Sequence, residues 1–139
     1  MNQITSINRI SNLATIDGQI EKLDIITNDI NYYFHTLKMI ANGHQKEEIR
    51  EQAKTYLGKQ LNIQLDLVGL QIVVRDIKSD YVKMLSGGKV KPVKLYQKMI
   101  KFESDMAHFD KINSKLRKIC FRFTNEYFQH DNRQYYKAA

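Results

Sequence analysis

The chain has 139 residues, of which 42% are hydrophobic and 27% charged, with one cysteine, one proline and no tryptophan. This composition is typical of a single globular domain, here residues 1–139, and it excludes a scaffold held together by internal disulfides. Few prolines and glycines favour long regular elements over a β-sandwich, which needs many turns.

The excess of positive charge is confined to the last third of the chain. The formal net charge is +7, and residues 86–139 hold twelve Lys and Arg against five Asp and Glu, a difference of +7. A basic segment of this kind is typical of either a solvated surface or a contact with an acidic partner.

The first predicted helix has apolar or small residues at alternating steps of three and four, and it ends at Asn42-Gly43. Such steps keep one helix face buried. The residues on this face are Leu13, Ile16, Ile20, Leu23, Thr27, Ile30, Phe34, Leu37 and Ala41. Residues 1–14 either continue this helix or form a separate short helix, and the separate helix is favoured.

The second predicted helix begins near residue 46 and continues to about residue 85. Its acidic first turn, Lys46-Glu47-Glu48, suits the positive end of a helix dipole. The buried line keeps one heptad phase for about five heptads, more than the three or four that make such a pattern meaningful. Its members are Ile49, Ala53, Tyr56, Gln60, Ile63, Leu67, Leu70, Val74, Ile77, Tyr81 and Met84.

Residues 61–74 also carry a competing strand signal. LNIQLDL alternates with period two, a β-branched run follows, and Gly58 can end a helix. The alternative fold is therefore α+β with a hairpin at 61–74. The continuous helix is favoured because the heptad phase is unchanged across the disputed stretch.

The third predicted helix follows the turn marked by Ser86-Gly87-Gly88, with Pro92 near its first position. Its core line again steps by three and four. The line consists of Leu95, Met99, Phe102, Met106, Phe109, Asn113, Leu116, Cys120, Phe123 and Tyr127. The pattern is lost near the C-terminus, so residues 132–139 are expected to fray.

The fold that these elements predict is all-α. The short links force neighbouring helices to run antiparallel, which gives an elongated, coiled-coil-like three-helix bundle with a short N-terminal helix as an extra element.

A second apolar line lies on the second helix, about 140° around its axis from the core line. It consists of Leu61, Leu65, Val68 and Ile72. Either the N-terminal segment with Ile4, Ile7 and Ile10 folds over it, or it is an interface with a second copy or a partner helix.

A basic face follows the third helix, with one cation or histidine per heptad and further lysines beside them. The set is Lys94, Lys98, Lys101, His108, Lys111, Lys115, Lys118 and Arg122. It is either a solvated helix back or a surface that binds a polyanion or an acidic partner.

No catalytic residues, cofactor or metal site are predicted. The histidines and Cys120 do not follow metal-ligand spacing, and no Gly-rich phosphate loop is present. The sequence favours a non-enzymatic interaction protein, namely an adaptor, an assembly factor or a chaperone-like subunit, with a homodimer or a protein partner. The alternative is a nucleic-acid-binding accessory protein.

Localisation is predicted from three features of the sequence. No signal peptide is expected in the opening residues, and residues 61–74, the longest apolar stretch, are interrupted by polar residues and too short to span a membrane. The lone Cys120 fits a reducing compartment. The prediction is a cytoplasmic protein without a transmembrane segment.

Overall fold

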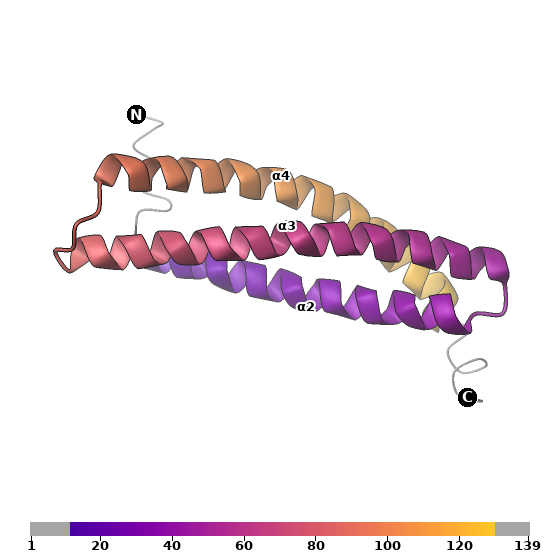
Figure 1. Ribbon diagram of the computed structural model, residues 1–139. Helices are drawn as coiled ribbons and strands as arrows, with labels where there is room; N and C mark the ends of the chain where they lie inside the picture. Colours follow the sequence, from indigo (N-terminus) through magenta and orange to yellow (C-terminus); the bar gives the residue numbers. More distant parts are fainter. Residues whose placement is uncertain (1–11, 130–139) are drawn as a thin grey trace. The chain divides into compact units, whose positions relative to one another are not determined.

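The computed structural model describes residues 12–129. Within them the chain forms three α-helices, α2 (Leu13–Gly43), α3 (Glu47–Leu85) and α4 (Pro92–Thr124), and α4 continues into a π-helical turn, η1 (Asn125–Gln129) (Figure 1). The all-α three-helix bundle is confirmed. The proposed helix at residues 1–14 and the frayed tail at 132–139 concern positions that lie wholly or mostly outside the described residues.

The hairpin alternative at residues 61–74 is wrong, because this stretch is helical throughout and lies inside α3. The heptad spacing and the period-two alternation of this stretch predict different structures, and tertiary packing decides in favour of the helix. Ile63, Leu67, Leu70 and Val74 are buried against the other helices, a spacing that only a helix can present to one side. Gly58 does not end the helix.

The chain divides into two compact units, and each of the three helices contributes to both. The first unit contains the chain up to Ile26 and Asp66–Asp110, and the second contains Thr27–Leu65 and the chain from Lys111 onward. The prediction of a single domain spanning 1–139 stays a prediction.

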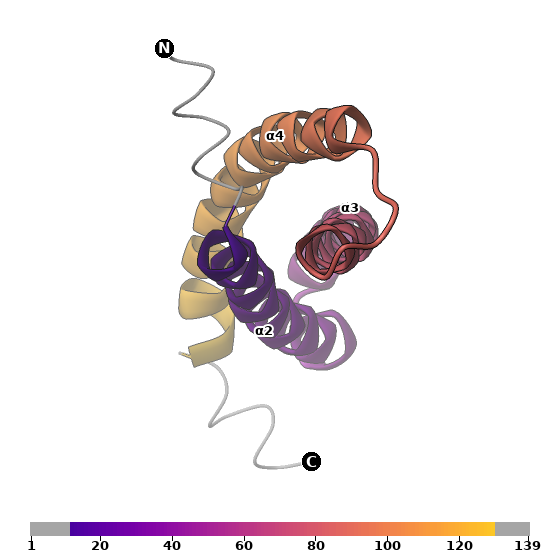
Figure 2. The ribbon, with the colours of Figure 1, turned by 90° about the vertical axis from the view of Figure 1, so that its left-hand side faces the viewer.

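In the first unit, the beginning of α2, the end of α3 and the beginning of α4 alternate in direction, so that α3 is antiparallel to both of the others (Figures 1 and 2). Asn12 caps α2, since its Oδ1 accepts the Thr15 backbone N–H at 2.8 Å. The core consists of residues on the three predicted lines. Its buried members are Ile16, Leu23, Leu67, Leu70, Val74, Ile77, Leu95, Met99, Phe102, Met106 and Phe109.

The end of α3 in this unit is closed by a glycine pair. Gly87 has φ +82°, and its N–H donates to Met84 O at 3.2 Å, while the Gly88 N–H donates to Lys83 O at 2.7 Å. This pair of bonds is a Schellman motif, which satisfies two carbonyls at the helix end. The chain then enters α4 at Pro92, where a missing N–H costs nothing.

In the second unit, the apolar core follows the predicted lines except on α2, where Tyr33 and Ile40 are buried although they lie beside the predicted line. Its buried apolar members are Ile30, Tyr33, Leu37, Ile40, Ala41, Ile49, Ala53, Ile63, Leu116, Cys120 and Phe123. Two buried threonines, Thr36 and Thr124, satisfy their hydroxyls on carbonyls of their own helices.

The link between α2 and α3 is organised by His44, which is buried. The Lys46 backbone N–H donates to Nδ1 of His44 at 3.0 Å, so the imidazole caps the start of α3. The ring also stands edge-on to Tyr127 with centroids 5.7 Å apart, and Arg50 donates to the His44 carbonyl at 2.6 Å. His44 therefore connects all three helical segments of the second unit.

Candidate interaction surfaces

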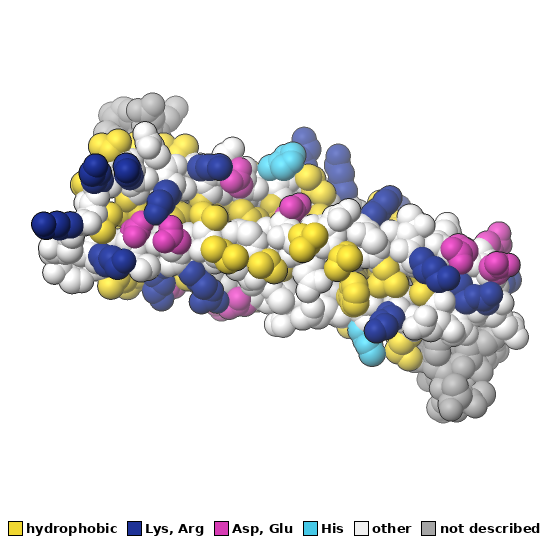
Figure 3. All heavy atoms as spheres, viewed as in Figure 1, with side chains coloured by type: hydrophobic (Ala, Val, Ile, Leu, Met, Phe, Trp, Pro, Cys, Tyr) yellow, Lys and Arg dark blue, Asp and Glu magenta, His cyan; other side chains and the backbone are white. Residues whose placement is uncertain are grey.

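The apolar stripe on α3 (Leu61, Leu65, Val68 and Ile72) is exposed to solvent. These side chains are 49%, 66%, 46% and 65% accessible, whereas the core-line residues of the same stretch (Ile63, Leu67, Leu70 and Val74) are buried. Figure 3 shows hydrophobic side chains along the outer surface of α3. The alternative in which Ile4, Ile7 and Ile10 cover the stripe concerns positions outside the described residues.

Two glycines flank the apolar stripe. By helix geometry Gly58 and Gly69 lie about 60–80° around the axis from Leu61. A Cβ added at either glycine would meet nothing within 4 Å, so neither is required by packing inside the chain. The backbone beside the stripe is consequently open to close approach by another helix.

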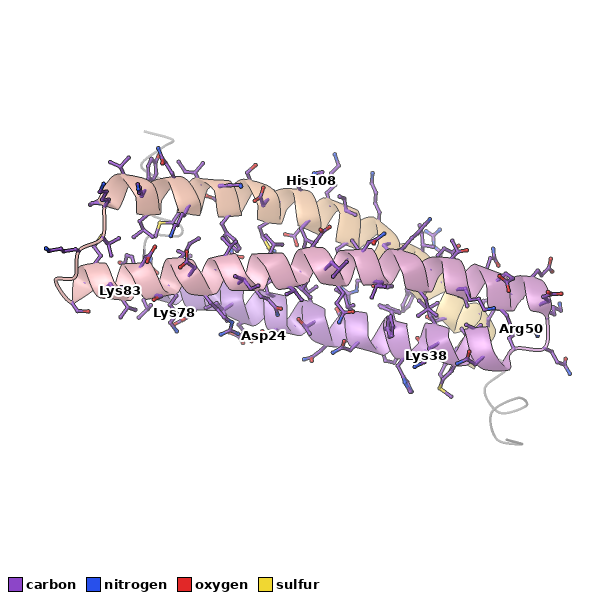
Figure 4. All side chains as sticks on the ribbon, in the orientation of Figure 1. Asp24, Lys38, Arg50, Lys78, Lys83 and His108 are labelled. Carbon is purple, nitrogen blue, oxygen red and sulfur yellow. The ribbon has the colours of Figure 1, made fainter. Side chains whose placement is uncertain are left out.

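The members of the basic face on α4 are all exposed. Lys94, Lys98, Lys101 and His108 belong to the first unit, and Lys111, Lys115, Lys118 and Arg122 belong to the second. Figure 4 shows His108 on the outer side of α4.

Lys98 differs from the other members of the basic face because it is paired inside its own unit. Its Nζ lies 2.8 Å from Asp76 Oδ2 and 2.7 Å from Asp80 Oδ2, both on α3. Hydrogen bonds to Asp76 and then to Asp80 raise the pKa of Lys98 above its ordinary value. Among the described residues, Lys98 is the member of the face that forms an ion pair, so it joins α4 to α3 and contributes less positive charge to the surface.

The basic face of the second unit has an aromatic neighbour. Phe121 follows Cys120 on α4 and is more than half exposed, and Lys118 and Arg122 stand within one turn of it. An exposed ring beside cations can stack on a nucleic-acid base.

Further ion pairs between helices are not predicted by the sequence. In the first unit Lys78 pairs with Asp17 at 2.7 Å, Arg75 with Asp24 at 3.8 Å, and Lys22 with Asp110 at 2.8 Å, and Figure 4 marks Lys78 and Asp24 on neighbouring helices. The two residues of each pair are 51 to 88 positions apart in the chain, so no local sequence pattern indicates that they meet.

The second unit has its own link between α4 and α2. Arg117 lies 3.1 Å from Asp29 and also contacts Tyr33. Burial raises the pKa of Tyr33, and the guanidinium of Arg117 partly opposes this effect.

The core of the second unit contains a polar pair. Gln60 donates from Nε2 to Cys120 Sγ at 3.2 Å, and both side chains are buried. Burial raises the pKa of the Cys120 thiol, with the Gln60 amide acting in the opposite direction. Cys120 is therefore a protonated, enclosed thiol at neutral pH and poorly suited to nucleophilic chemistry.

Residues 12–129 contain no group of three His, Cys, Asp or Glu side chains arranged to hold a metal ion. None of the helices in that range is long and apolar enough to cross a membrane.

A surface hollow in the second unit follows the end of α2, where Figure 4 labels Lys38. It is lined by His35, Lys38, Met39, Asn42 and Gly43, all from α2 itself. An open hollow built from one helix does not enclose a small molecule as a typical ligand pocket does.

Comparisons with known proteins were made at three levels. No family model, curated protein or solved structure matches this chain. The apolar stripe and the basic face are therefore the features of the chain that bear on its function.

Proposed function

We propose that this chain is a non-enzymatic helical interaction protein, an adaptor, assembly factor or chaperone-like subunit, that binds through the apolar stripe of α3. The supporting observation is that Leu61, Leu65, Val68 and Ile72 are 46–66% exposed on a stretch of α3 whose core-line residues are already buried. Apolar side chains that recur along one helix face and add nothing to the core typically mark an interface.

The occupant we favour is a second copy of the chain. The stripe has steps of four, three and four, a spacing that is the same in both chain directions. Two antiparallel copies of α3 would therefore place Leu61 opposite Ile72 and Leu65 opposite Val68. A twofold-symmetric contact of this kind needs one self-complementary surface.

The basic face would supply an electrostatic contact for an acidic partner. Its exposed lysines lack ion-pair partners among the described residues, apart from Lys98. Such a face accelerates encounter with an oppositely charged surface and makes binding sensitive to salt. A cytoplasmic role fits the buried thiol of Cys120, which stays reduced most readily there.

The self-contact is tested by Leu65→Glu, which puts a charge at the centre of the stripe. Sedimentation velocity should show a dimer for the parent chain and a monomer for the variant, since a buried unpaired charge is strongly unfavourable. The matched control is Ile25→Glu on α2, an exposed apolar residue of similar accessibility, which should leave the sedimentation coefficient unchanged. A parent chain that is monomeric at all concentrations would remove the self-contact.

The second candidate is a nucleic-acid-binding accessory protein, favoured by the exposed Phe121 beside Lys118 and Arg122. Affinity for a labelled single-stranded oligonucleotide should then fall steeply with added salt, because phosphate-bound counterions are released on binding. Phe121→Ala should weaken binding at every salt concentration. The absence of binding at low salt would exclude this candidate.

A further inference from the structure

The connection between α3 and α4 brings lysines and exposed apolar side chains together at one end of the first unit. It includes the last turn of α3, the linking residues and the first turn of α4. We call the following residues the α3–α4 tip: Val82, Lys83, Leu85, Lys89, Lys91, Val93 and Lys94.

The tip has a defined backbone. The Schellman bonds at Gly87 and Gly88 hold the end of α3, and the Val90 N–H donates to Gly88 O at 3.1 Å. A side chain at position 88 would place its Cβ 2.9 Å from Lys83 O, so the chain turns as closely there as a glycine permits. The lysines on either side of the turn are thus presented on a preformed structure, and binding need not order the loop.

The apolar residues of the tip are among the most exposed in the described chain. Leu85 is 64% and Val93 67% accessible, and Val82 is 42% accessible. They lie in the terminal turns of two helices. Their exposure has no structural benefit within the unit.

The charge within the tip itself has one sign. Residues 81–102 contain six lysines and no Asp or Glu. Lys98 is neutralised by Asp76 and Asp80, but Lys83, Lys89, Lys91 and Lys94 form no ion pair with any described residue. Figure 3 shows basic side chains around this end of α3 and α4, with Lys83 marked in Figure 4.

We propose that the α3–α4 tip docks on the surface of an anionic phospholipid bilayer. The lysines would meet the headgroup phosphates and carboxylates, while Leu85 and Val93 would enter the boundary between headgroups and acyl chains. Juxtaposed basic and apolar side chains are the combination that such an interface binds, since each contributes separately.

The apolar residues distinguish this partner from another polyanion. A protein that binds single-stranded nucleic acid usually adds aromatic rings, on which the bases stack, to its cationic side chains. The exposed apolar members of the tip are aliphatic, so only the lysines of the tip would contribute to binding a nucleic acid. Their burial is favourable only when the anionic surface has an apolar layer beneath it. The tip shares Lys94 with the basic face but does not involve the apolar stripe. Membrane binding by the tip is therefore independent of the proposed self-contact.

The first experiment uses the complete chain and vesicles of phosphatidylcholine with and without phosphatidylserine. The chain should sediment with the anionic vesicles at low salt, remain in the supernatant with phosphatidylcholine alone, and be released by added sodium chloride. Because the chain has no tryptophan, Val93→Trp introduces a single indole whose emission can be excited selectively at wavelengths where tyrosine absorbs little. Its emission should shift to the blue on anionic vesicles, whereas that of the control Ile25→Trp should not.

Paired substitutions separate the two contributions. Lys89→Gln with Lys91→Gln should reduce the vesicle partition coefficient about 30-fold, from about 1 kcal/mol for each lysine near an anionic surface. Leu85→Asn with Val93→Asn should reduce it about tenfold or more, from the loss of apolar burial. The control pair Lys115→Gln with Lys118→Gln removes the same charge from α4 in the second unit and should have a much smaller effect.

Two results would overturn the proposal. One is the absence of sedimentation with phosphatidylserine vesicles at low salt while circular dichroism shows the chain to be folded. The other is binding that depends on the lysine pair but is unchanged by Leu85→Asn with Val93→Asn, together with no blue shift for Val93→Trp, since this describes a general polyanion site and not a lipid surface.

Discussion

Gln60 is a polar residue within the buried core line of α3. It occupies a core position of α3 and is 2% exposed, yet its side chain is polar. The amide nitrogen donates to Cys120, but Oε1 has no hydrogen-bond partner among the described residues. A buried acceptor without a partner loses its hydration and recovers nothing, so this position lowers stability.

We predict that Gln60→Leu raises the free energy of unfolding by about 1 kcal/mol, because it removes the unpaired acceptor and keeps a similar side-chain size. Urea denaturation followed by circular dichroism measures the change. Gln52→Leu is the matched control, since Gln52 is exposed on the same helix of the same unit. A lower stability for Gln60→Leu would show that the hydrogen bond to Cys120 outweighs the cost of the unpaired oxygen.

At the scale of the elements, ion pairs join each helix of the first unit to the other two. Lys98 on α4 is placed between Asp76 and Asp80, two carboxylates one turn apart on α3. Without it these like charges would repel each other at the i, i+4 spacing. The lysine thus compensates an unfavourable pair within α3 as well as joining two helices.

Lys98→Gln should therefore lower the melting temperature, whereas Lys94→Gln, one turn earlier on the same helix, should leave it nearly unchanged. Thermal unfolding at low and high sodium chloride measures both, and the difference between the variants should shrink as salt screens the carboxylates. Equal melting temperatures at low salt would mean that Lys98 contributes no more than a solvated lysine.

For the whole molecule, two buried titratable groups make stability depend on pH at the alkaline end. Burial raises the pKa of both Cys120 and Tyr33 above ordinary values of about 9 and about 10. The unfolded chain therefore loses these protons at a lower pH than the folded chain does. Their contribution is complete below the ordinary pKa values and is lost as pH rises through the raised ones.

We expect the melting temperature to decline as the pH rises above about 9, in part because of the two protons that the folded state retains. Cys120→Ala should be less stable at neutral pH because it leaves a cavity, but its decline with pH should be shallower. If the melting temperatures of parent and variant declined equally with pH across the alkaline range, a role for the thiol would be contradicted.

The helices and their core faces follow from the sequence to a large extent. The core lines of α2, α3 and α4 were named from spacing alone, and nearly all of their members are buried or half-buried, with Leu13 at the start of α2 as the exposed case. A period of 3.6 residues is a local property, so it can be recognised wherever one face must avoid water. The same reasoning found the apolar stripe, which is exposed.

What tertiary structure decided is which side chains meet across helices. Local alternation at 61–74 permitted a hairpin, and only burial of Leu67 and Leu70 against other helices selects the helix. Lys98 belonged to the basic face by its spacing, but its pairing with Asp76 and Asp80 depends on how α3 and α4 are placed side by side. Periodicity determines the face of a helix on which a residue lies, whereas the identity of the neighbouring side chain depends on the register and rotation of two packed helices.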